Sequence, residues 1–293
     1  MVRQDFRFVE RLRVRWAEID AQNIVFNGHY LMYFDTAIAG YWRAMALPYH
    51  DTMRALEGDL YVRKATLEYL GSARYDDIID VGVRCERVGN SSIHFDCAVF
   101  RQATLLVSGT LAYVFADPTS QTSRPVPHAL RDCFSAFEAG QAMVDVRLGR
   151  WADLESDLRN VRTRVFIEEQ GVPKEMEWDA IDADALHAIA VNALGMPLGT
   201  GRGFFDASGA FRIGRMAVLA SMRGHGVGRR LLDTLMEAGR AQGAQHAGLS
   251  AQTSAVAFYL RAGFQTLGDA YDDAGIPHIE MTRRLAPTAQ KPG

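Results

Sequence analysis

The first half of the chain shows one long helical pattern and several strand patterns. Apolar residues recur at helical spacing from Leu31 to Met45, and Pro48 ends that segment. Short apolar or alternating runs bounded by turn residues predict strands over residues 6–16, 66–69, 78–88, 92–101 and 105–115. An apolar helix followed by an antiparallel meander predicts an α+β domain in which the sheet wraps around the helix.

The second half alternates between strand and helix patterns. Strands are predicted over residues 144–148, 187–192, 199–205, 211–219 and 247–250. Helices are predicted over 153–170 and 254–261, and another begins near Gly226. A short helix over 128–139 ends at Gly140, so the domain boundary is placed there. We therefore expect domains at 1–140 and 141–286, and a disordered tail at 287–293.

Length, charge and cysteine content narrow the class of protein. A chain of 293 residues is long enough for two domains with separate cores. The formal charge is −3 and there is no basic run, which argues against nucleic acid or an anionic membrane as a partner. Charged residues near the start leave no signal-peptide core, and the longest apolar stretch, 105–116, is too short to span a bilayer. We expect a cytoplasmic protein.

The cysteines and the remaining residue pattern predict no metal site. Cys85, Cys97 and Cys133 have no metal-ligand spacing, and their odd number argues against a disulfide framework. They are expected to be buried and reduced.

A glycine-rich loop, RGHGVG from Arg223 to Gly228, stands between a predicted strand and a predicted helix. Glycines let the backbone approach an anion closely, and the first amides of a helix favour a pyrophosphate. From the pattern alone a tight turn is equally good. A Rossmann loop would need glycine at position 229, which is Arg, and the Gly-Lys-Ser/Thr of a P-loop is absent.

The loop resembles the R-x-x-G-x-G loop of GNAT-superfamily N-acetyltransferases. Further matching segments are 161–182 (VRTRVFIEEQGVPKEMEWDAID), PLGTGR, IGRMAV, AFYLRAGF and AGIPHIEM, so the resemblance covers about 143–285. It implies a mixed sheet with splayed strands that binds acetyl-CoA as donor and an amine as acceptor. Cofactor contacts are implied for Met216, Val218, Arg223, Gly224, His225, Gly226, Val227, Gly228 and Ser254.

The same resemblance implies that Tyr259 protonates the departing CoA thiolate. From the residue alone, a tyrosine beside Phe258 is more often a core residue. The general base stays open. An acidic cluster could bind a cationic amine or be a solvated loop; its members are Glu168, Glu169, Glu175, Glu177, Asp179 and Asp182. His187 and His278 match recurring family positions and are expected to line the acceptor side.

The segment DAQNIVFNGHY, from Asp20 to Tyr30, resembles hotdog-fold acyl-CoA thioesterases related to the hydroxybenzoyl-CoA thioesterase, over about 5–138. The resemblance implies that Asp20 is the nucleophile or general base and that the backbone N–H near Asn27 polarises the thioester carbonyl. His29 is a further candidate. Asn23 stands where the family often has glycine and can adopt a left-handed turn. From the residue alone, Asp20 is a turn or helix cap.

The predicted function is that of a bifunctional enzyme with two CoA-thioester activities: acyl-CoA hydrolysis in the first domain and amine acetylation in the second. The family builds hotdog sites across a subunit interface, so a homodimer or higher homo-oligomer is implied. The alternative is a non-catalytic hotdog module that binds acyl-CoA or dimerises and regulates the acetyltransferase. A second alternative is a GNAT half that binds acetyl-CoA without transferring the acetyl group.

Overall fold

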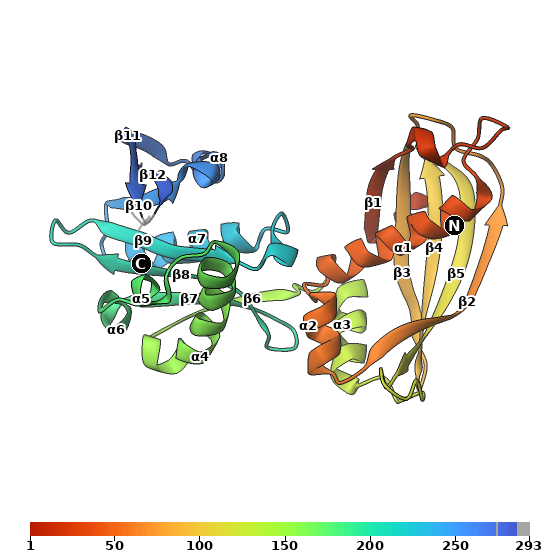
Figure 1. The fold of residues 1–293 in the computed structure, drawn as a ribbon, viewed down its shortest axis with the longest axis horizontal. Coiled ribbons are helices and arrows are strands. Elements are labelled where there is room, and N and C mark those ends of the chain that lie inside the picture. The colour runs from red at the N-terminus through yellow and green to blue at the C-terminus, as the bar shows by residue number, and fades with distance from the viewer. Residues whose placement is uncertain (274, 286–293) are drawn as a thin grey trace, which may run out of the picture. The chain divides into compact units, whose positions relative to one another are not determined.

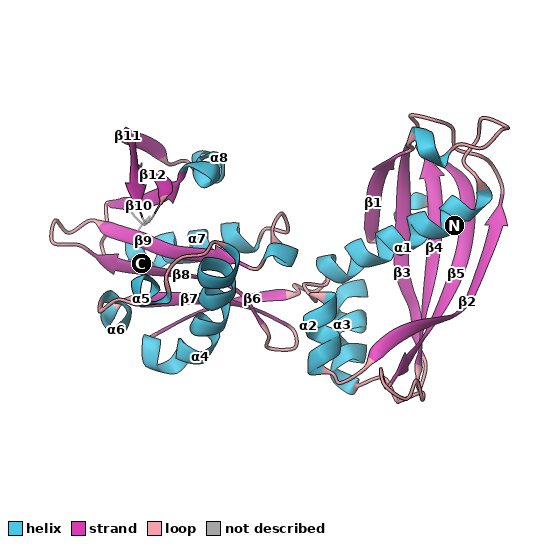
Figure 2. Ribbon diagram, viewed as in Figure 1, coloured by secondary structure: helices cyan, strands magenta, loops and turns pink. Residues whose placement is uncertain are grey.

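The computed structural model describes residues 1–273 and 275–285. Its contacts divide the chain into two compact units, Met1–Met143 and Val144–Gly293. Figures 1 and 2 show the helices and strands of each unit. The tail expected at 287–293 lies outside the described residues.

The first unit is a five-stranded antiparallel sheet with strand order β1-β3-β4-β5-β2. Its strands are β1 (Phe8–Arg13), β2 (Asp59–Tyr69), β3 (Ile78–Val88), β4 (Ser92–Arg101) and β5 (Thr104–Ala116). Its helices are α1 (Asn27–Ala44), α2 (Tyr49–Ala55) and α3 (His128–Glu138). The predicted α+β architecture and the apolar helix are confirmed. The strand predicted at 66–69 is the end of a longer strand, and α2 is an additional helix.

Helix α1 lies across one face of this sheet and is the centre of the core (Figure 1). The Tyr41 ring contacts Phe95 and Phe137 with centroids 5.7 and 4.9 Å apart. A Cβ at Gly109 would lie 2.7 Å from the Phe34 ring and 2.8 Å from the Thr66 carbonyl oxygen. The glycine therefore lets α1 approach β5, and this packing fixes the start of α1.

The second unit is a seven-stranded mixed sheet with strand order β11-β12-β10-β9-β8-β7-β6. Its strands are β6 (Val144–Gly149), β7 (Leu186–Asn192), β8 (Pro197–Phe205), β9 (Phe211–Val218), β10 (His246–Gln252), β11 (Gln265–Asp273) and β12 (Ile276–Arg284). Its helices are α4 (Trp151–Arg162), α5 (Lys174–Glu177), α6 (Ile181–Asp184), α7 (Val227–Ala241) and α8 (Val256–Arg261). Strands β11 and β12 and helices α5 and α6 were not predicted.

The helix predicted over 153–170 consists of two parts. Helix α4 passes without a break into π-helical turns at Thr163–Glu169. Its apolar face packs on the sheet through Leu158, Val161 and Val165. A π-helical stretch displaces the following residues around the helix axis and is frequent at functional sites.

The predicted splay is present between β9 and β10. These strands are parallel and pair only at Phe211–Ala247 and Arg212–Gly248. Strand β9 continues to Val218 and β10 to Gln252, so the two strands part for most of their length. A gap in a sheet leaves backbone N–H and C=O groups without ladder partners, and such groups are available to a ligand. No described helix is long and apolar enough to cross a membrane.

Candidate functional sites

The glycine-rich loop connects the end of β9 to the start of α7. Gly224 and Gly226 have φ of +82° and +81°, a left-handed conformation that L-residues with a Cβ rarely adopt. No atom lies within 4 Å of the position where either Cβ would be. Gly226 is the N-cap of α7, a helix of 15 residues whose first amides have no intrahelical acceptor. The loop therefore has the geometry of an anion site at a helix N-terminus.

A cavity of about 400 Å³ lies beside this loop, and we call it the loop cavity. Predicted cofactor residues that line it are Met216, Val218, Arg223, Gly224, Gly226, Val227 and Gly228. His225 and Ser254 are not among its lining residues. Ser254 is exposed in the short turn before α8, where its neighbour Ala255 reaches the cavity instead.

Arg223 connects the loop to the π-helical segment. Its two Nη atoms donate to the carboxylate oxygens of Glu169 at 2.6 and 2.7 Å, and its Nε donates to the Val218 carbonyl at 3.0 Å. The guanidinium holds the pKa of Glu169 below its usual range. This bidentate pair orients Arg223 along the edge of the loop cavity.

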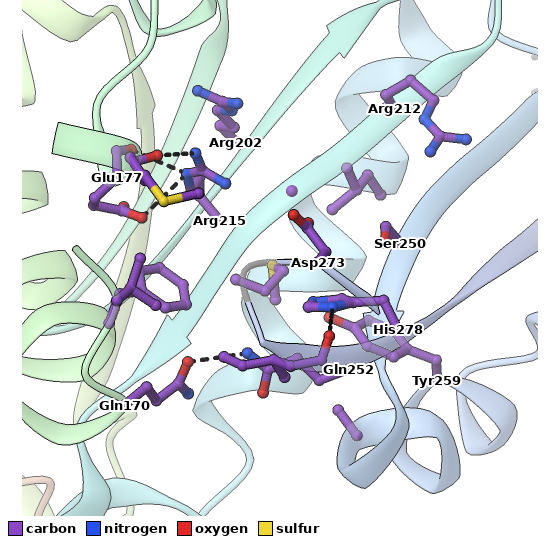
Figure 3. A pocket seen from close by; sticks show the side chains of 18 of the residues that line it. Gln170, Glu177, Arg202, Arg212, Arg215, Ser250, Gln252, Tyr259, Asp273 and His278 are labelled. Atoms are coloured by element: carbon purple, nitrogen blue, oxygen red, sulfur yellow. Dashed lines mark hydrogen bonds and ion pairs between the residues drawn. The ribbon is translucent and has the colours of Figure 1, made fainter. Parts of the chain in front are cut away.

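A second cavity, of about 360 Å³, occupies the gap between β9 and β10, and we call it the slot cavity (Figure 3). Strand β9 lines it with Arg212 to Met216, and β10 lines it with Ser250 and Gln252. Its charged and titratable lining residues are Glu177, Arg202, Arg212, Arg215, Tyr259, Asp273 and His278. Such a lining fits a polar ligand.

The two cavities meet at Tyr259. Tyr259, Met216 and Ala255 line both of them. Tyr259 is buried on α8, with its ring against Phe258 and Phe264 at 4.9 and 5.9 Å. Burial raises the pKa of its phenol to about 12. The phenol therefore keeps its proton at neutral pH and can donate it to a group lying between the two cavities.

The acidic cluster contains both exposed and buried carboxylates. Neither an amine-binding cluster nor a solvated loop therefore describes all of its members. Glu168 and Glu175 are exposed. Glu177 and Asp182 are buried and bind Arg162, with Nε–Oε1 and Nη1–Oδ1 distances of 2.5 and 2.8 Å. The buried carboxylates are thus neutralised by arginines rather than left for a cationic ligand or for water.

Arg202 and Arg162 share the same carboxylate. Arg202 Nη1 lies 2.7 Å from Asp182 Oδ1 and 2.6 Å from Asp179 Oδ1. Burial alone would raise the pKa of Asp182, but hydrogen bonds from Arg162 and Arg202 outweigh it and lower the pKa. Burial raises the pKa of Glu177 despite its arginine partners. The network fixes the segment after the π-helical turns, which carries Glu177 to the wall of the slot cavity.

The two candidate histidines differ in position. His187 is buried outside the slot cavity, with Nε2 2.8 Å from the Asp182 carbonyl oxygen, and burial lowers its pKa. The expectation that it lines the acceptor side is wrong. His278 does line the slot cavity, with Nδ1 2.8 Å from the Ile276 carbonyl oxygen.

In the first unit, a cavity of about 590 Å³ lies at the start of α1 and includes Asp20 and Asn27 in its wall. Asp20 is half-buried, and its Oδ1 accepts the Gln22 N–H at 2.8 Å. Asn23 has φ of +57°, which confirms the left-handed turn expected there. Asn27 is the first residue of α1, so the helix amides begin at the cavity.

His29 is outside this cavity. Its ring packs edge-on against Phe26 with centroids 5.9 Å apart, and it is not among the lining residues. Tyr69 does line the cavity and donates its hydroxyl to the Asn27 carbonyl at 3.1 Å.

Sequence reasoning missed Glu18, a buried carboxylate two residues before Asp20. It accepts the Tyr33 hydroxyl at 2.6 Å and the Arg15 N–H at 2.8 Å, and its own carbonyl accepts the Phe26 N–H. Burial would raise its pKa, but the bonds from Tyr33 and Arg15 outweigh burial and lower it. Glu18 ties the segment before the turn to the segment after it. A glutamate in a polar stretch gives no sequence signal for this role.

Known proteins match each half of the chain separately. A family model described as "Acetyltransferase (GNAT) domain" matches residues 154–285, and one described as "Thioesterase superfamily" matches residues 22–108. The chain therefore belongs to the GNAT acetyltransferases through its second half and to the thioesterase superfamily through its first half. No group of His, Cys, Asp and Glu in the described part of the chain could hold a metal ion.

Individual proteins are similar to one half of the chain or the other. "Uncharacterized N-acetyltransferase YjcF" of Bacillus subtilis is 37% identical over 124 residues, covering 42% of this chain and 87% of its own. A protein of Aquifex aeolicus named "Putative esterase" is 32% identical over 95 residues, covering 32% of this chain and 73% of its own. A crystal structure of a thioesterase with coenzyme A and Zn from Thermus thermophilus is 24% identical, with a TM-score of 0.42 over 47% of this chain and 99% of that one.

The buried arginine network leads to a stability prediction. In Arg162→Met, the carboxylates of Glu177 and Asp182 stay buried with one guanidinium removed, and such a loss costs about 3–5 kcal/mol. Arg159→Met is the control, because Arg159 lies one turn earlier, packs over the same Trp178 ring and forms a half-exposed pair with Glu155. It should cost about 0.5 kcal/mol or less. Hydrogen exchange of α4 amides at increasing urea concentration measures both, and equal losses would contradict the role of the network.

Proposed function

We propose that the second unit transfers the acetyl group of acetyl-CoA to an amine. The observation that carries this proposal is that Tyr259 and Met216 line both the loop cavity and the slot cavity. A ligand that enters from the loop cavity and one that enters from the slot cavity would meet at these two residues. A transferase that joins two substrates directly needs such a meeting point.

The residues fit acetyl-CoA as the donor. The amides at the start of α7, reached through left-handed Gly224 and Gly226, would hold the pyrophosphate. The backbone of Met216 and Val218, on the edge of β9 that faces the gap, would hydrogen-bond the pantetheine arm and the acetyl carbonyl. Tyr259 would protonate the departing thiolate, since its phenol keeps its proton at neutral pH.

We further propose that the first unit hydrolyses an acyl-CoA thioester. Asp20 lines the same cavity as Asn27, so a carboxylate and the N-terminal amides of α1 face one space. The carboxylate would attack the thioester or activate water, and the amides would stabilise the oxyanion that develops. His29 has no part in this proposal, because its ring packs on Phe26 outside the cavity.

The site of the first unit would be completed by a second copy of the chain. Strand β2 is an edge strand, and Val62 and Tyr69 on it are 54% and 50% exposed. A long exposed edge strand is a template for pairing with another strand. Tyr69 also lines the Asp20 cavity, so strand pairing at this edge would place the partner close to the site.

A non-catalytic first unit is the competing proposal. It is favoured by the hydrogen bond from Gln22 N–H to Asp20 Oδ1, which is what a turn-capping aspartate makes. In that case the first unit would bind acyl-CoA or dimerise and would regulate the acetyltransferase.

Gly226→Ala tests the anion site. The alanine Cβ is strained at φ of +81°, so the loop should shift and the affinity for coenzyme A should fall by about tenfold or more. Gly195→Ala is the matched control, because Gly195 has φ of +75° in the turn between β7 and β8, also with no atom near the added Cβ. Calorimetric titration with coenzyme A measures both. Equal affinities for the two variants would count against the loop as the anion site.

Tyr259→Phe tests the proton donor. Acetyl transfer to primary amines should fall by about 10²–10⁴-fold in kcat, because the thiolate must leave without its acid. The affinity for coenzyme A should stay within about twofold, since the ring and its packing remain. Thiol release with acetyl-CoA and a panel of amines measures the first quantity, and calorimetry measures the second. Full activity of the variant would show that Tyr259 is a core residue only.

Asp20 variants separate hydrolysis from capping. Thiol release from a panel of acyl-CoAs, without amine, should fall at least about 100-fold in both Asp20→Ala and Asp20→Asn. The asparagine keeps an oxygen that can accept the Gln22 N–H but lacks the carboxylate. Asp117→Ala is the control, because Asp117 accepts N–H bonds from Thr119 and Ser120 in another turn. Full activity of Asp20→Asn would favour the non-catalytic module.

A further inference from the structure

His278 is a titratable residue of the slot cavity to which no role has been assigned so far. It lies on β12 between two neighbouring strands, where its register partners are Gln252 on β10 and Tyr271 on β11. Both His278 and Tyr259 line the slot cavity, and Figure 3 shows the two side chains on the same side of it. A base and an acid for one reaction must reach the same space, and this pair does.

The hydrogen bond of His278 determines its tautomer. Its Nδ1 lies 2.8 Å from the carbonyl oxygen of Ile276. A carbonyl oxygen only accepts hydrogen bonds, so Nδ1 carries the proton of the neutral ring and Nε2 carries the lone pair. Within residues 1–273 and 275–285, no hydrogen bond to Nε2 is present. The lone pair is therefore available to a ligand.

The ring of His278 is also held in place from the side. It stacks on Tyr271 with centroids 6.3 Å apart and an interplanar angle of 29°. The Tyr271 hydroxyl donates to Glu280 at 2.9 Å and lies 2.5 Å from the Ser250 hydroxyl, so the tyrosine is itself fixed. A base whose orientation is set before the substrate arrives loses little entropy in the reaction.

The other titratable groups of the slot cavity are less suited. Glu177 is committed to Arg162 and Arg215. Arg212 faces the cavity from β9 and is paired with Glu280. Asp273 on β11 is the remaining carboxylate of the wall, and it is exposed. Histidine is the side chain that most often serves as a general base, and an imidazole nitrogen with a free lone pair suits the task of taking a proton from an amine better than an exposed carboxylate does.

We propose that His278 Nε2 is the general base of the acetyl transfer, and that the acceptor is a polar primary amine that arrives as an ammonium ion. The inference rests on the proposed acetyltransferase function. His278 takes one proton from the ammonium group, and the freed lone pair of nitrogen forms the C–N bond at the acetyl carbon. The C–S bond breaks, and the departing thiolate takes the phenol proton of Tyr259.

The protons balance over the whole reaction. The second amine proton, lost as the tetrahedral intermediate collapses, restores the Tyr259 phenol, and the first leaves His278 for solvent. One amide, one thiol and one proton form from each acetyl-CoA and ammonium ion.

The test is a pH profile of kcat/KM for acetyl-CoA with amino acids, amino sugars and polyamines as probes, with the amine-free thiol release subtracted. His278→Gln should lower kcat/KM by about 10²–10⁴-fold. In the variant, the fall of kcat/KM at low pH should involve one proton fewer than in the wild type. His246→Gln is the matched control, since His246 is exposed at the far end of β10. Coenzyme A affinity should be unchanged in both variants, which excludes a folding defect.

Two further variants sharpen the result. In His278→Gly, added imidazole should restore part of the lost rate, which a merely structural role would not allow. Asp273→Asn should show the same fall of kcat/KM at low pH as the wild type. The proposal is overturned if His278→Gln stays within about threefold of the wild type, or if the fall of kcat/KM at low pH is lost with Asp273→Asn instead.

Failure of the proposed function would look different. It would appear as a wild-type protein that transfers acetyl to none of the probe amines. In that case the ¹⁵N NMR spectrum of His278 in the acetyl-CoA complex decides the inference. A neutral ring with the proton on Nδ1 supports it, and a ring with the proton on Nε2 contradicts it.

Discussion

The parting of β9 and β10 is the feature on which the second unit depends. Two parallel strands that pair at only two positions leave the rest of their facing edges without ladder partners. The loop cavity and the slot cavity are both built on the free part of β9, and Met216 belongs to both. Because unpaired backbone groups inside a protein are costly, the gap is stable only where side chains, water or a ligand satisfy them. The geometry that weakens the sheet is thus also the geometry that places two adjoining cavities on β9.

In the first unit the cavity lies at the start of a helix instead of in a gap between strands. Close packing of α1 on β5 at Gly109 fixes the helix axis, and Glu18 ties the segment before the Asp20 turn to the segment after it. The carboxylate and the helix N-terminus are therefore presented to one cavity by rigid neighbours. In both units a helix N-terminus faces a cavity, which suits the phosphate groups or oxyanions of CoA-thioester chemistry.

Sequence patterns predicted the elements with clear apolar periodicity and missed several that are short or bury few residues. Helix α1 and strands β3, β4 and β5 have clear apolar periodicity, and they were found. All nine residues of β11 are exposed, so it carries no alternation that could mark it as a strand. The loop glycines and Tyr259 were found through motifs and line the predicted cavities, whereas Ser254, His29 and His187 do not line them. Spacing along the chain says which residues belong to a motif, but the direction of each side chain depends on neighbours distant in sequence.

The buried arginines show the same limit of sequence-based prediction for charged residues. Arg162 lies on the buried side of α4. In the sequence a charged residue there interrupts the apolar pattern and suggests exposure, but the side chain is only 1% exposed. Its burial is tolerable because Glu177, Asp182 and the Trp178 ring surround the guanidinium. Those partners come from the segment that follows the π-helical turns, so the arginine holds that segment against the sheet. Glu177 is occupied by Arg162 and Arg215 in this way, and this is one of the reasons for proposing the imidazole of His278 as the proton acceptor in the slot cavity.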